Sequence, residues 1–408
     1  MAINTEQNKL NVPHLRFPEF HGEWEKHGLS EYLDFKNGLN PDSKRFGKGI
    51  KFISVMDILN NPVITYDCIR ASVQATDAEI SSFSVENGDI LFQRSSETLE
   101  DVGRANVYID DKVAVFGGFV IRGKKKANYN PLFFRYLLSS PYARKRIIPM
   151  GAGAQHFNIG QEGLSKVLLN FPSIEEQTKI ASLLHLLDER IATQSKLIED
   201  LKKLKSAIIE NVFDDKHSER LQLDNVGSYI RGLTYSSNDV VEHGGTLVVR
   251  SNNIVNGSLL DYNNNVVFVN KQMSAEQQLQ NGDIVICMAN GSSSLVGKSS
   301  FYDGNWHSPI TVGAFCGIYR SKEPIVKWLF QTNKYRRYIW NSLQGGNGAI
   351  ANLNGEDILN MSFSIPNAPI KDTCVKMLTS VDSALENNIS LCALYTLQKQ
   401  HLLRQMFI

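Results

Sequence analysis

Residues 172–212 read PSIEEQTKIASLLHLLDERIATQSKLIEDLKKLKSAIIENV, and this stretch sets the architecture of the chain. Apolar residues recur along it at alternating steps of four and three, from Ile180 to Ile208, and glycine is absent. A repeat of 3.5 residues is typical of a coiled-coil seam, so the stretch predicts a long helix that packs against another helix. About 38 residues at a rise of 1.5 Å span ~57 Å, which is more than one small globular domain covers.

A second ladder of this kind follows Pro366. Polar residues interrupt the two ladders at matching steps, Gln194 and Lys205 in the first and Asn388 and Lys399 in the second. Polar seam residues reduce stability but fix register, so this coincidence predicts that the two helices pack on each other. The alternative is two amphipathic helices, each lying on its own globular domain. The predicted seam consists of Ile180, Leu184, Leu187, Ile191, Ile198, Leu201, Ile208, Leu378, Val381, Leu385, Tyr395 and Leu402.

The whole chain is an internal duplication. A shift of 194 residues places Asn87-Gly88-Asp89-Ile90 on Asn281-Gly282-Asp283-Ile284, and Asp188 on Asp382. Each copy opens with short β-like runs broken by turn signals, contains one helix (after Asn130 in the first copy, residues 324–338 in the second) and ends in the long ladder. The sequence therefore predicts an α/β (α+β) fold with two strand-rich domains, each followed by a long helix.

Composition and motifs narrow the function. The formal net charge of the 408 residues is +1, so a DNA-binding protein of this composition must gather its cations on one face. The polar N-terminus and the lack of a long apolar stretch predict a soluble, cytoplasmic protein. Cysteines and histidines lack the spacing of metal ligands, and Walker, nucleophile-elbow and kinase signatures are absent. We therefore expect no catalytic, cofactor or metal site.

One continuous pattern carries a family resemblance. It begins at Asn158-Ile159, passes through Phe171-Pro172-Ser173-Ile174-Glu175-Glu176-Gln177 and ends near Asp188-x-x-Ile191. This pattern is similar to the entry into the conserved central helix of the specificity (S) subunits of type I restriction-modification systems, and the Asn-Gly-Asp-Ile strand resembles part of their target recognition domains. The resemblance covers the whole chain. The second copy departs from it, with Ile370-Lys371-Asp372 where Glu-Gln is expected.

The resemblance implies that two target recognition domains each read one half of an asymmetric, interrupted DNA sequence. It implies that the two long helices pair as an antiparallel coiled coil with pseudo-two-fold symmetry, set the gap and dock two methyltransferase (M) subunits, which bring in restriction (R) subunits. The chain itself would be non-catalytic, with AdoMet and ATP bound by the partner subunits. The expected parts are 1–172 (first target recognition domain), 173–215 (central helix), 216–366 (second target recognition domain) and 367–408 (C-terminal helix).

Candidate DNA contacts follow equivalent strands in the two copies. Arg94-Ser95-Ser96 and Asn290-Gly291-Ser292-Ser293 both come shortly after the Asn-Gly-Asp-Ile run. Base edges are read by arginine, lysine, amide and hydroxyl side chains, and phosphates are contacted by cations and small polar residues. Any one surface cation is more often simply solvated. The predicted set is Lys44, Arg45, Lys48, Lys51, Arg94, Ser95, Ser96, Arg104, Gln155, His156, Arg231, Tyr235, Arg250, Asn252, Asn253, Asn290, Ser292, Ser293, Lys298, Gln344 and Asn347.

Two other functions stay open. The near-zero net charge slightly favours a coiled-coil adaptor whose globular domains bind protein instead of DNA. The chain could also be the recognition half of a split methyltransferase that works without a restriction partner.

Overall fold

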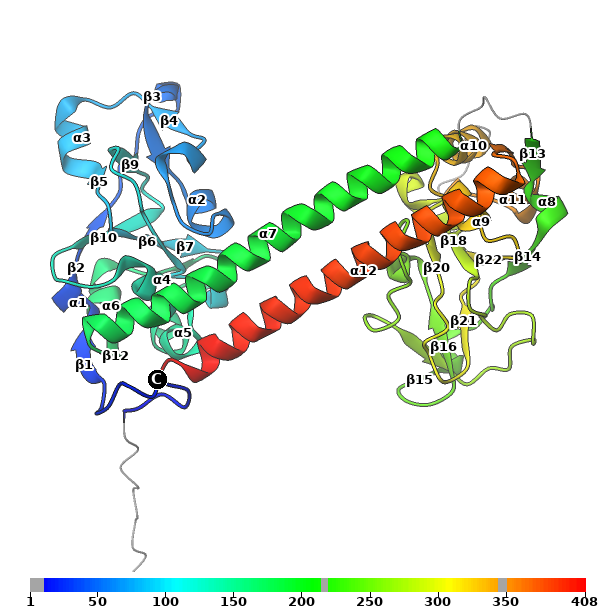
Figure 1. Cartoon of the computed structure of the whole chain (residues 1–408). Helices are drawn as coiled ribbons and strands as arrows, with labels where there is room; N and C mark the ends of the chain where they lie inside the picture. Colours follow the sequence, from blue (N-terminus) through cyan, green and yellow to red (C-terminus); the bar gives the residue numbers. More distant parts are fainter. Residues whose placement is uncertain (1–10, 214–218, 344–350) are drawn as a thin grey trace, which may run out of the picture. The chain divides into compact units, whose positions relative to one another are not determined.

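The computed structural model describes residues 11–213, 219–343 and 351–408. The chain forms two compact units, the first made of Met1–Ser195 and Ile389–Ile408 and the second of Lys196–Asn388. Each unit thus contains one strand-rich domain together with part of each long helix (Figure 1). Because the structure groups the helices with the domains that they touch, the four-part division expected from the sequence stays a prediction.

Among the described residues, the first unit contains two four-stranded sheets and two short strand pairs. Its strands are β1 (Glu25–Gly28), β2 (Leu33–Asn37), β3 (Phe46–Ile53), β4 (Ser72–Val73), β5 (Ser84–Val85), β6 (Ile90–Gln93), β7 (Ser95–Ser96), β8 (Ala105–Val107), β9 (Ala114–Phe116), β10 (Val120–Lys125), β11 (Phe157–Asn158) and β12 (Leu168–Phe171). One sheet has the antiparallel order β2-β10-β6-β8. The other has the order β4-β3-β9-β5, in which β3 and β9 are parallel. The strand pairs are β1-β12 and β11-β7.

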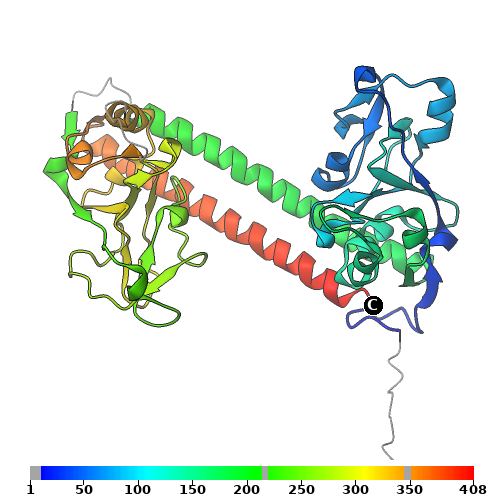
Figure 2. The same cartoon turned by 180° about the vertical axis from the view of Figure 1, so that it is seen from behind.

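Among the described residues, the second unit, seen from behind in Figure 2, also contains two four-stranded sheets and two short strand pairs. Its strands are β13 (Glu219–Gln222), β14 (Gly227–Arg231), β15 (Val240–Val241), β16 (Thr246–Val249), β17 (Val267–Val269), β18 (Ile284–Cys287), β19 (Ala289–Asn290), β20 (Ser299–Phe301), β21 (Ile310–Val312), β22 (Cys316–Ser321), β23 (Ala351–Asn352) and β24 (Ser362–Ile365). The order β14-β22-β18-β20 matches the first antiparallel sheet strand for strand. The second sheet has the order β15-β17-β16-β21 and also contains one parallel pair, β16 with β21. The strand pairs β13-β24 and β19-β23 correspond to β1-β12 and β11-β7 of the first unit.

Short helices and the two long ones complete the units. They are α1 (Leu29–Tyr32), α2 (Val55–Asn60), α3 (Asp77–Phe83), α4 (Pro131–Ser139), α5 (Pro141–Ile147), α6 (Gln161–Ser165), α7 (Ile174–Val212), α8 (Leu223–Val226), α9 (Val326–Leu329), α10 (Asn333–Leu343), α11 (Gly355–Leu359) and α12 (Ala368–Gln405). The single helix predicted for residues 324–338 was wrong, because two helices, α9 and α10, occupy that region. The Thr332 hydroxyl accepts the N–H of Tyr335 at 3.0 Å and so caps a new helix. Ser140 caps α5 in the same way through Ala143.

The Asn-Gly-Asp-Ile motif is a structural turn that starts β6 and β18. Its glycines adopt the left-handed conformation, with φ of +93° at Gly88 and +89° at Gly282, which other residues rarely adopt. The aspartates are buried. Asp89 accepts backbone N–H groups, while Asp283 forms two hydrogen bonds with the Arg320 guanidinium, at 2.8 and 2.6 Å. The motif therefore has a structural role and fixes the loops around these strands.

The Glu-Gln pair after Pro172 anchors the beginning of α7. The buried Glu176 carboxylate accepts two hydrogen bonds from Arg16, at 2.8 and 2.7 Å. The Gln177 side chain joins the carbonyl of Pro172 to the N–H of Asn130. In the second copy, Lys371 forms an ion pair at 3.3 Å with Glu323, which precedes α9. The departure from Glu-Gln thus replaces one polar anchor by another.

Both long helices complete the core of each unit. In the first unit, Ile180 and Leu184 of α7, Leu402 of α12 and Met406 just after it belong to the same buried cluster as Trp24. In the second unit, Ile209 of α7 and Cys374 and Leu378 of α12 pack into the domain core. Neither helix therefore lies on a single globular domain, which rules out the alternative arrangement considered above.

Candidate nucleic-acid interface

An ion cluster joins the helices to the domain in each unit. In the first unit, the Asp188 carboxylate pairs with Lys399 of α12 and with Arg135 of α4 at 3.1 Å, and it accepts a hydrogen bond from the Tyr136 hydroxyl at 2.8 Å. Burial opposes the ionisation of Asp188, but Lys399, Tyr136 and Arg135 outweigh it and hold its pKa below the ordinary value. The cluster therefore ties three elements together around one charge.

The second unit builds the same cluster with the helices exchanged. Asp382 of α12 pairs with Lys205 of α7 at 2.7 Å and with Lys327 of α9 at 3.0 Å, and it accepts a hydrogen bond from the Trp328 indole at 3.0 Å. Burial lowers the pKa of Lys205, against the opposing pull of Asp382. Two of the four polar residues that interrupt the ladders, Lys205 and Lys399, are thus each paired with an aspartate of the other helix.

The helix halves within a unit run antiparallel. In the first unit, Asp188 contacts Lys399, and the Ser195 hydroxyl lies 3.6 Å from the Cys392 sulfur, so residue numbers fall along α12 as they rise along α7. All twelve predicted seam residues are buried or half-buried. Their assignment to one continuous seam stays a prediction.

Strand pairing brings two of the predicted DNA-contact loops of the first unit together. β7, which contains Ser95 and Ser96, pairs with β11, directly after the exposed Gln155 and His156. The Ser95 hydroxyl donates to the side chain of Asn158, and the Arg94 guanidinium donates to the carbonyl of Gly118 at 3.3 Å. In the second unit, β19 with Asn290 pairs with β23 in the same way. Gln344 and Asn347 lie outside the described residues.

Three predicted contacts are engaged inside their own domain, and their contact with DNA stays a prediction. The Arg45 guanidinium makes two hydrogen bonds to Glu79, which lower the pKa of that carboxyl to about 2. The Lys51 ammonium donates to the carbonyl of Ile69 at 2.6 Å. Asn253 is 1% exposed, and its amide donates to two carbonyls of its own loop. The sequence shows the residue type but not these partners, which lie up to 34 positions away.

The other predicted contacts remain at the surface. The exposed ones are Lys44, Lys48, Arg104, Gln155, His156, Arg231, Arg250, Asn252, Ser292 and Ser293, and the half-buried ones are Arg94, Ser95, Ser96, Tyr235, Asn290 and Lys298. Some have partners within the domain: Arg104 pairs with Asp101 at 2.6 Å, and Arg250 donates to the carbonyl of Asn265 at 2.9 Å. Which of these residues contact DNA stays a prediction.

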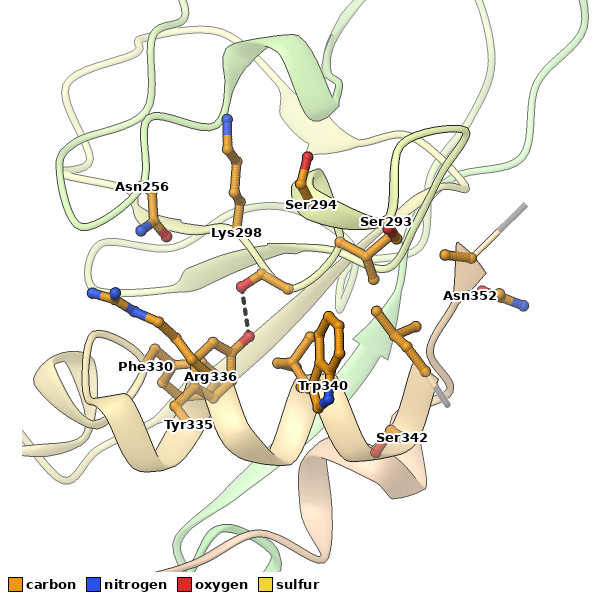
Figure 3. Close-up of a pocket in the computed structure, with 15 residues that line it drawn as sticks. Asn256, Ser293, Ser294, Lys298, Phe330, Tyr335, Arg336, Trp340, Ser342 and Asn352 are labelled. Carbon is orange, nitrogen blue, oxygen red and sulfur yellow. Dashed lines mark hydrogen bonds between the residues drawn. The ribbon is translucent and has the colours of Figure 1, made fainter. Parts of the chain in front are cut away.

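A cavity of about 620 Å³ opens beside the serine loop of the second unit (Figure 3). Ser293, Ser294 and Lys298 line it from one side, and Arg336 and Trp340 of α10 line it from the other. No carboxylate is among the described residues that line the cavity. Two cations and several hydroxyls among the lining side chains suit a phosphate and sugar backbone.

Sequence reasoning missed the α10 side of this cavity. Arg336 and Trp340 carry no motif, and only their positions on one face of a helix could have pointed to them. The residue equivalent to Arg336 in the first unit is Arg144, because each is the fourth residue after its helix cap. The Arg144 guanidinium donates to the carbonyls of Glu100 and Val102 at 2.8 and 2.7 Å, and burial lowers its pKa to about 10. The two units thus differ at matched positions.

Among the described residues, the helices include none that is long and apolar enough to cross a membrane. Across the same residues, histidine, cysteine and acidic side chains do not gather in groups that could hold a metal ion.

Comparison with known proteins identifies a family to which part of this chain is similar. The family described as "Type I restriction modification DNA specificity domain" matches residues 21–203. The matched stretch is 183 of the 408 residues and lies mostly in the first unit. The resemblance found in the sequence is thereby confirmed, and the first unit contains a DNA sequence-recognition domain.

Curated specificity subunits align with part of the chain. It is 35% identical over 155 residues to the EcoKI specificity subunit of Escherichia coli K12, and 34% identical over 153 residues to the StySPI specificity subunit of Salmonella potsdam. Each alignment covers 36% of this chain and 31% of the relative, so the chain matches about a third of the length of these proteins. The relatives are specificity subunits, a non-catalytic role in type I systems.

Solved structures support the fold over nearly the whole chain. The type I S subunit from M. genitalium aligns with a TM-score of 0.62 at 15% identity, covering 97% of this chain and 99% of that one. A chain from a study of complex assembly and conformational transition of the type I R-M system aligns with a TM-score of 0.51 at 13% identity, covering 93% and 96%. The predicted fold class, strand-rich α/β domains with two long helices, is confirmed.

Proposed function

We propose that this chain is the non-catalytic specificity subunit of a type I restriction-modification complex, with each strand-rich domain reading one half of an asymmetric, interrupted DNA sequence. The observation that carries the proposal is that the two units share one fold but have different side chains in the equivalent loop. Arg94-Ser95-Ser96 follows β6, and Asn290-Gly291-Ser292-Ser293 follows β18. Arginine favours guanine and asparagine favours adenine in the major groove, so two such loops suit two different half-sites.

The cavity beside the serine loop supports a phosphate contact in the second half-site. Lys298 and Arg336 supply two positive charges, and no carboxylate among the described lining residues repels a phosphate. The first unit uses the equivalent arginine, Arg144, inside its own domain. We therefore expect the two domains to hold the DNA backbone differently as well as to read different bases.

The long helices present exposed apolar side chains. Leu186, Leu197 and Leu204 of α7 are 64%, 44% and 51% exposed, and Leu394 and Leu397 of α12 are 61% and 60% exposed. Leu186, Leu197 and Leu204 are spaced 11 and 7 residues apart and so share one helix face, and exposed apolar side chains of this kind suit a protein interface. We propose that two M subunits dock on these helices and bring in R subunits, that AdoMet and ATP are bound by those partners, and that the complex acts in the cytoplasm.

The test is to sequence the DNA methylation of a host that lacks its own systems and expresses this chain with its cognate M subunit. We expect a new two-part motif with methylated adenines in unequal halves. The matched control is the M subunit expressed alone. If the complex assembles and no new methylation appears, the DNA-reading proposal fails and the adaptor function gains support.

Salt dependence separates DNA binding from adaptor function. Each phosphate contact releases counterions, so the affinity of the assembled complex for its duplex should fall steeply as salt rises from 50 to 200 mM, by on the order of 10³-fold for about six contacts. Arg336→Gln should make this slope shallower by about one contact, while Lys202→Gln on the exposed face of α7 serves as the matched control. A flat salt response of the wild-type complex would contradict phosphate binding.

A further inference from the structure

Two phenylalanines occupy the same exposed position in the two units. Phe119 is 69% exposed and Phe315 is 66% exposed, the two highest fractions among the large apolar residues that the structure describes. Each is the third residue of a four-residue turn, closed by the N–H of Val120 bonding the carbonyl of Gly117 and the N–H of Cys316 bonding that of Gly313, both at 2.8 Å. The turns join β9 to β10 and β21 to β22.

The fold gives no structural reason for phenylalanine at this position. Both phenylalanines have negative φ, a turn conformation that most residues adopt, and an exposed ring gains nothing from burial. The turns themselves are rigid, since Phe116 and Val120 on either side of the first are fully buried. A Cβ on Gly38 would overlap the carbonyl oxygen of Gly117, so a neighbouring segment packs tightly against the turn. Each ring therefore projects from a fixed support.

The rings lie beside the loops that we propose to read DNA. The carbonyl of Phe119 accepts the N–H of Arg94 at 2.9 Å. The carbonyl of Phe315 accepts the N–H of Ala289 at 3.1 Å, one residue before Asn290. In the first unit, Phe119 also lines a groove of about 450 Å³ together with Met56 and Ser95. No charged residue is among the described residues that line this groove.

We infer that Phe119 and Phe315 are the apolar base contacts of the two half-sites, each packing on the C5-methyl group of a thymine. This inference rests on the proposed function. The thymine methyl is the apolar group that B-DNA presents in the major groove, and it is read by apolar side chains. The Arg94 loop and the Asn290 loop supply polar contacts directly beside the rings. The ring on its rigid turn then supplies an apolar base contact next to the polar contacts of the loop.

The test measures binding of the assembled S–M complex to duplexes that carry its methylated motif, with each thymine replaced in turn by deoxyuridine, which lacks the methyl group. For the wild type, we expect one replacement in each half to weaken binding about three- to fivefold, the value for one buried methyl group. Phe119→Ala should abolish the effect in one half only, and Phe315→Ala in the other. Val113→Ala and Val255→Ala, which change residues 45% and 46% exposed, serve as matched controls.

Each outcome decides the inference. Wild-type binding that is indifferent to every replacement overturns it, as does a Phe119→Ala complex that keeps the full sensitivity. If either alanine variant instead prevents assembly with M subunits, the ring belongs to a protein interface and the base contact is refuted. Failure of the wild-type complex to prefer its motif over a scrambled duplex would count against the proposed function itself, which separates the two results.

Discussion

Asp188 and Asp382 hold equivalent positions in the two units, and each balances two cations. Asp382 is 5% exposed and faces Lys205 and Lys327. A buried carboxylate of this kind gives little net stability beyond that of an apolar substitute, but removing it leaves its cations unpaired. We therefore expect these ion clusters to fix the register of the two helices more than to add stability.

We expect Asp382→Asn to destabilise the second unit by about 3 kcal/mol, because Lys205 and Lys327 then lose their counter-charge. Thermal and urea unfolding followed by circular dichroism measure the change. Asp200→Asn, on the exposed face of α7, is the matched control and should change the unfolding midpoint little. Replacing both Asp382 and Lys205 by leucine and methionine should recover much of the loss; equal stability of Asp382→Asn and the wild type would contradict the role of the cluster.

The pH dependence of stability follows from Asp188. Its pKa is lower in the folded chain than the unfolded value of about 3.9, so its contribution is fully present above that pH and is lost as pH falls through the folded pKa. Unfolding free energy measured from pH 6 to pH 3 should therefore fall less steeply for Asp188→Asn than for the wild type. Parallel curves would show that Asp188 titrates alike in both states.

At the scale of elements, the long helices combine packing and spacing. α7 contributes Ile180 and Leu184 to the core of one unit and Ile209 to the core of the other. Under the proposed function, its length sets the distance between half-sites. The 3.5-residue ladder then restricts which changes in length keep the apolar face aligned, and whole heptads do so.

Deleting residues 191–197 from α7 and 390–396 from α12 removes one heptad from each helix. The helices shorten by ~10.5 Å, about three base pairs at 3.4 Å each. We expect the methylated motif to keep both half-sites and to lose about three base pairs from its gap, as read by methylome sequencing. An unchanged gap in an assembled, active complex would refute the ruler role of the helices.

At the scale of the whole molecule, the duplication makes the two half-sites separable. Because the strand-rich domains repeat one topology, an exchange of residues 24–170 for those of a related specificity subunit should replace one half of the motif and leave the other half and the gap unchanged. Methylome sequencing of the exchanged complex is the measurement. A motif altered in both halves would show that the domains do not read independently.

The sequence alone determined the elements and their repetition. Three patterns carried this information: the ladder in residues 172–212, the 194-residue shift and the motif around Pro172. Each can be recognised in the sequence without knowledge of long-range contacts. They were sufficient for the fold class and the family. The helix at 324–338 failed because a cap at Thr332, a single hydroxyl, divides an otherwise helical stretch.

Only the tertiary structure decided which side chains are available at the surface. Asn253 and Arg104 look alike as candidates in the sequence, yet one is buried and the other exposed. Asp188 meets Lys399 across 211 positions, and Gly38 packs against Gly117 in the turn that carries Phe119. Such contacts join residues far apart in the chain, so no local pattern encodes them. Periodicity reports which face of an element is apolar, whereas burial and pairing depend on what the fold places against it.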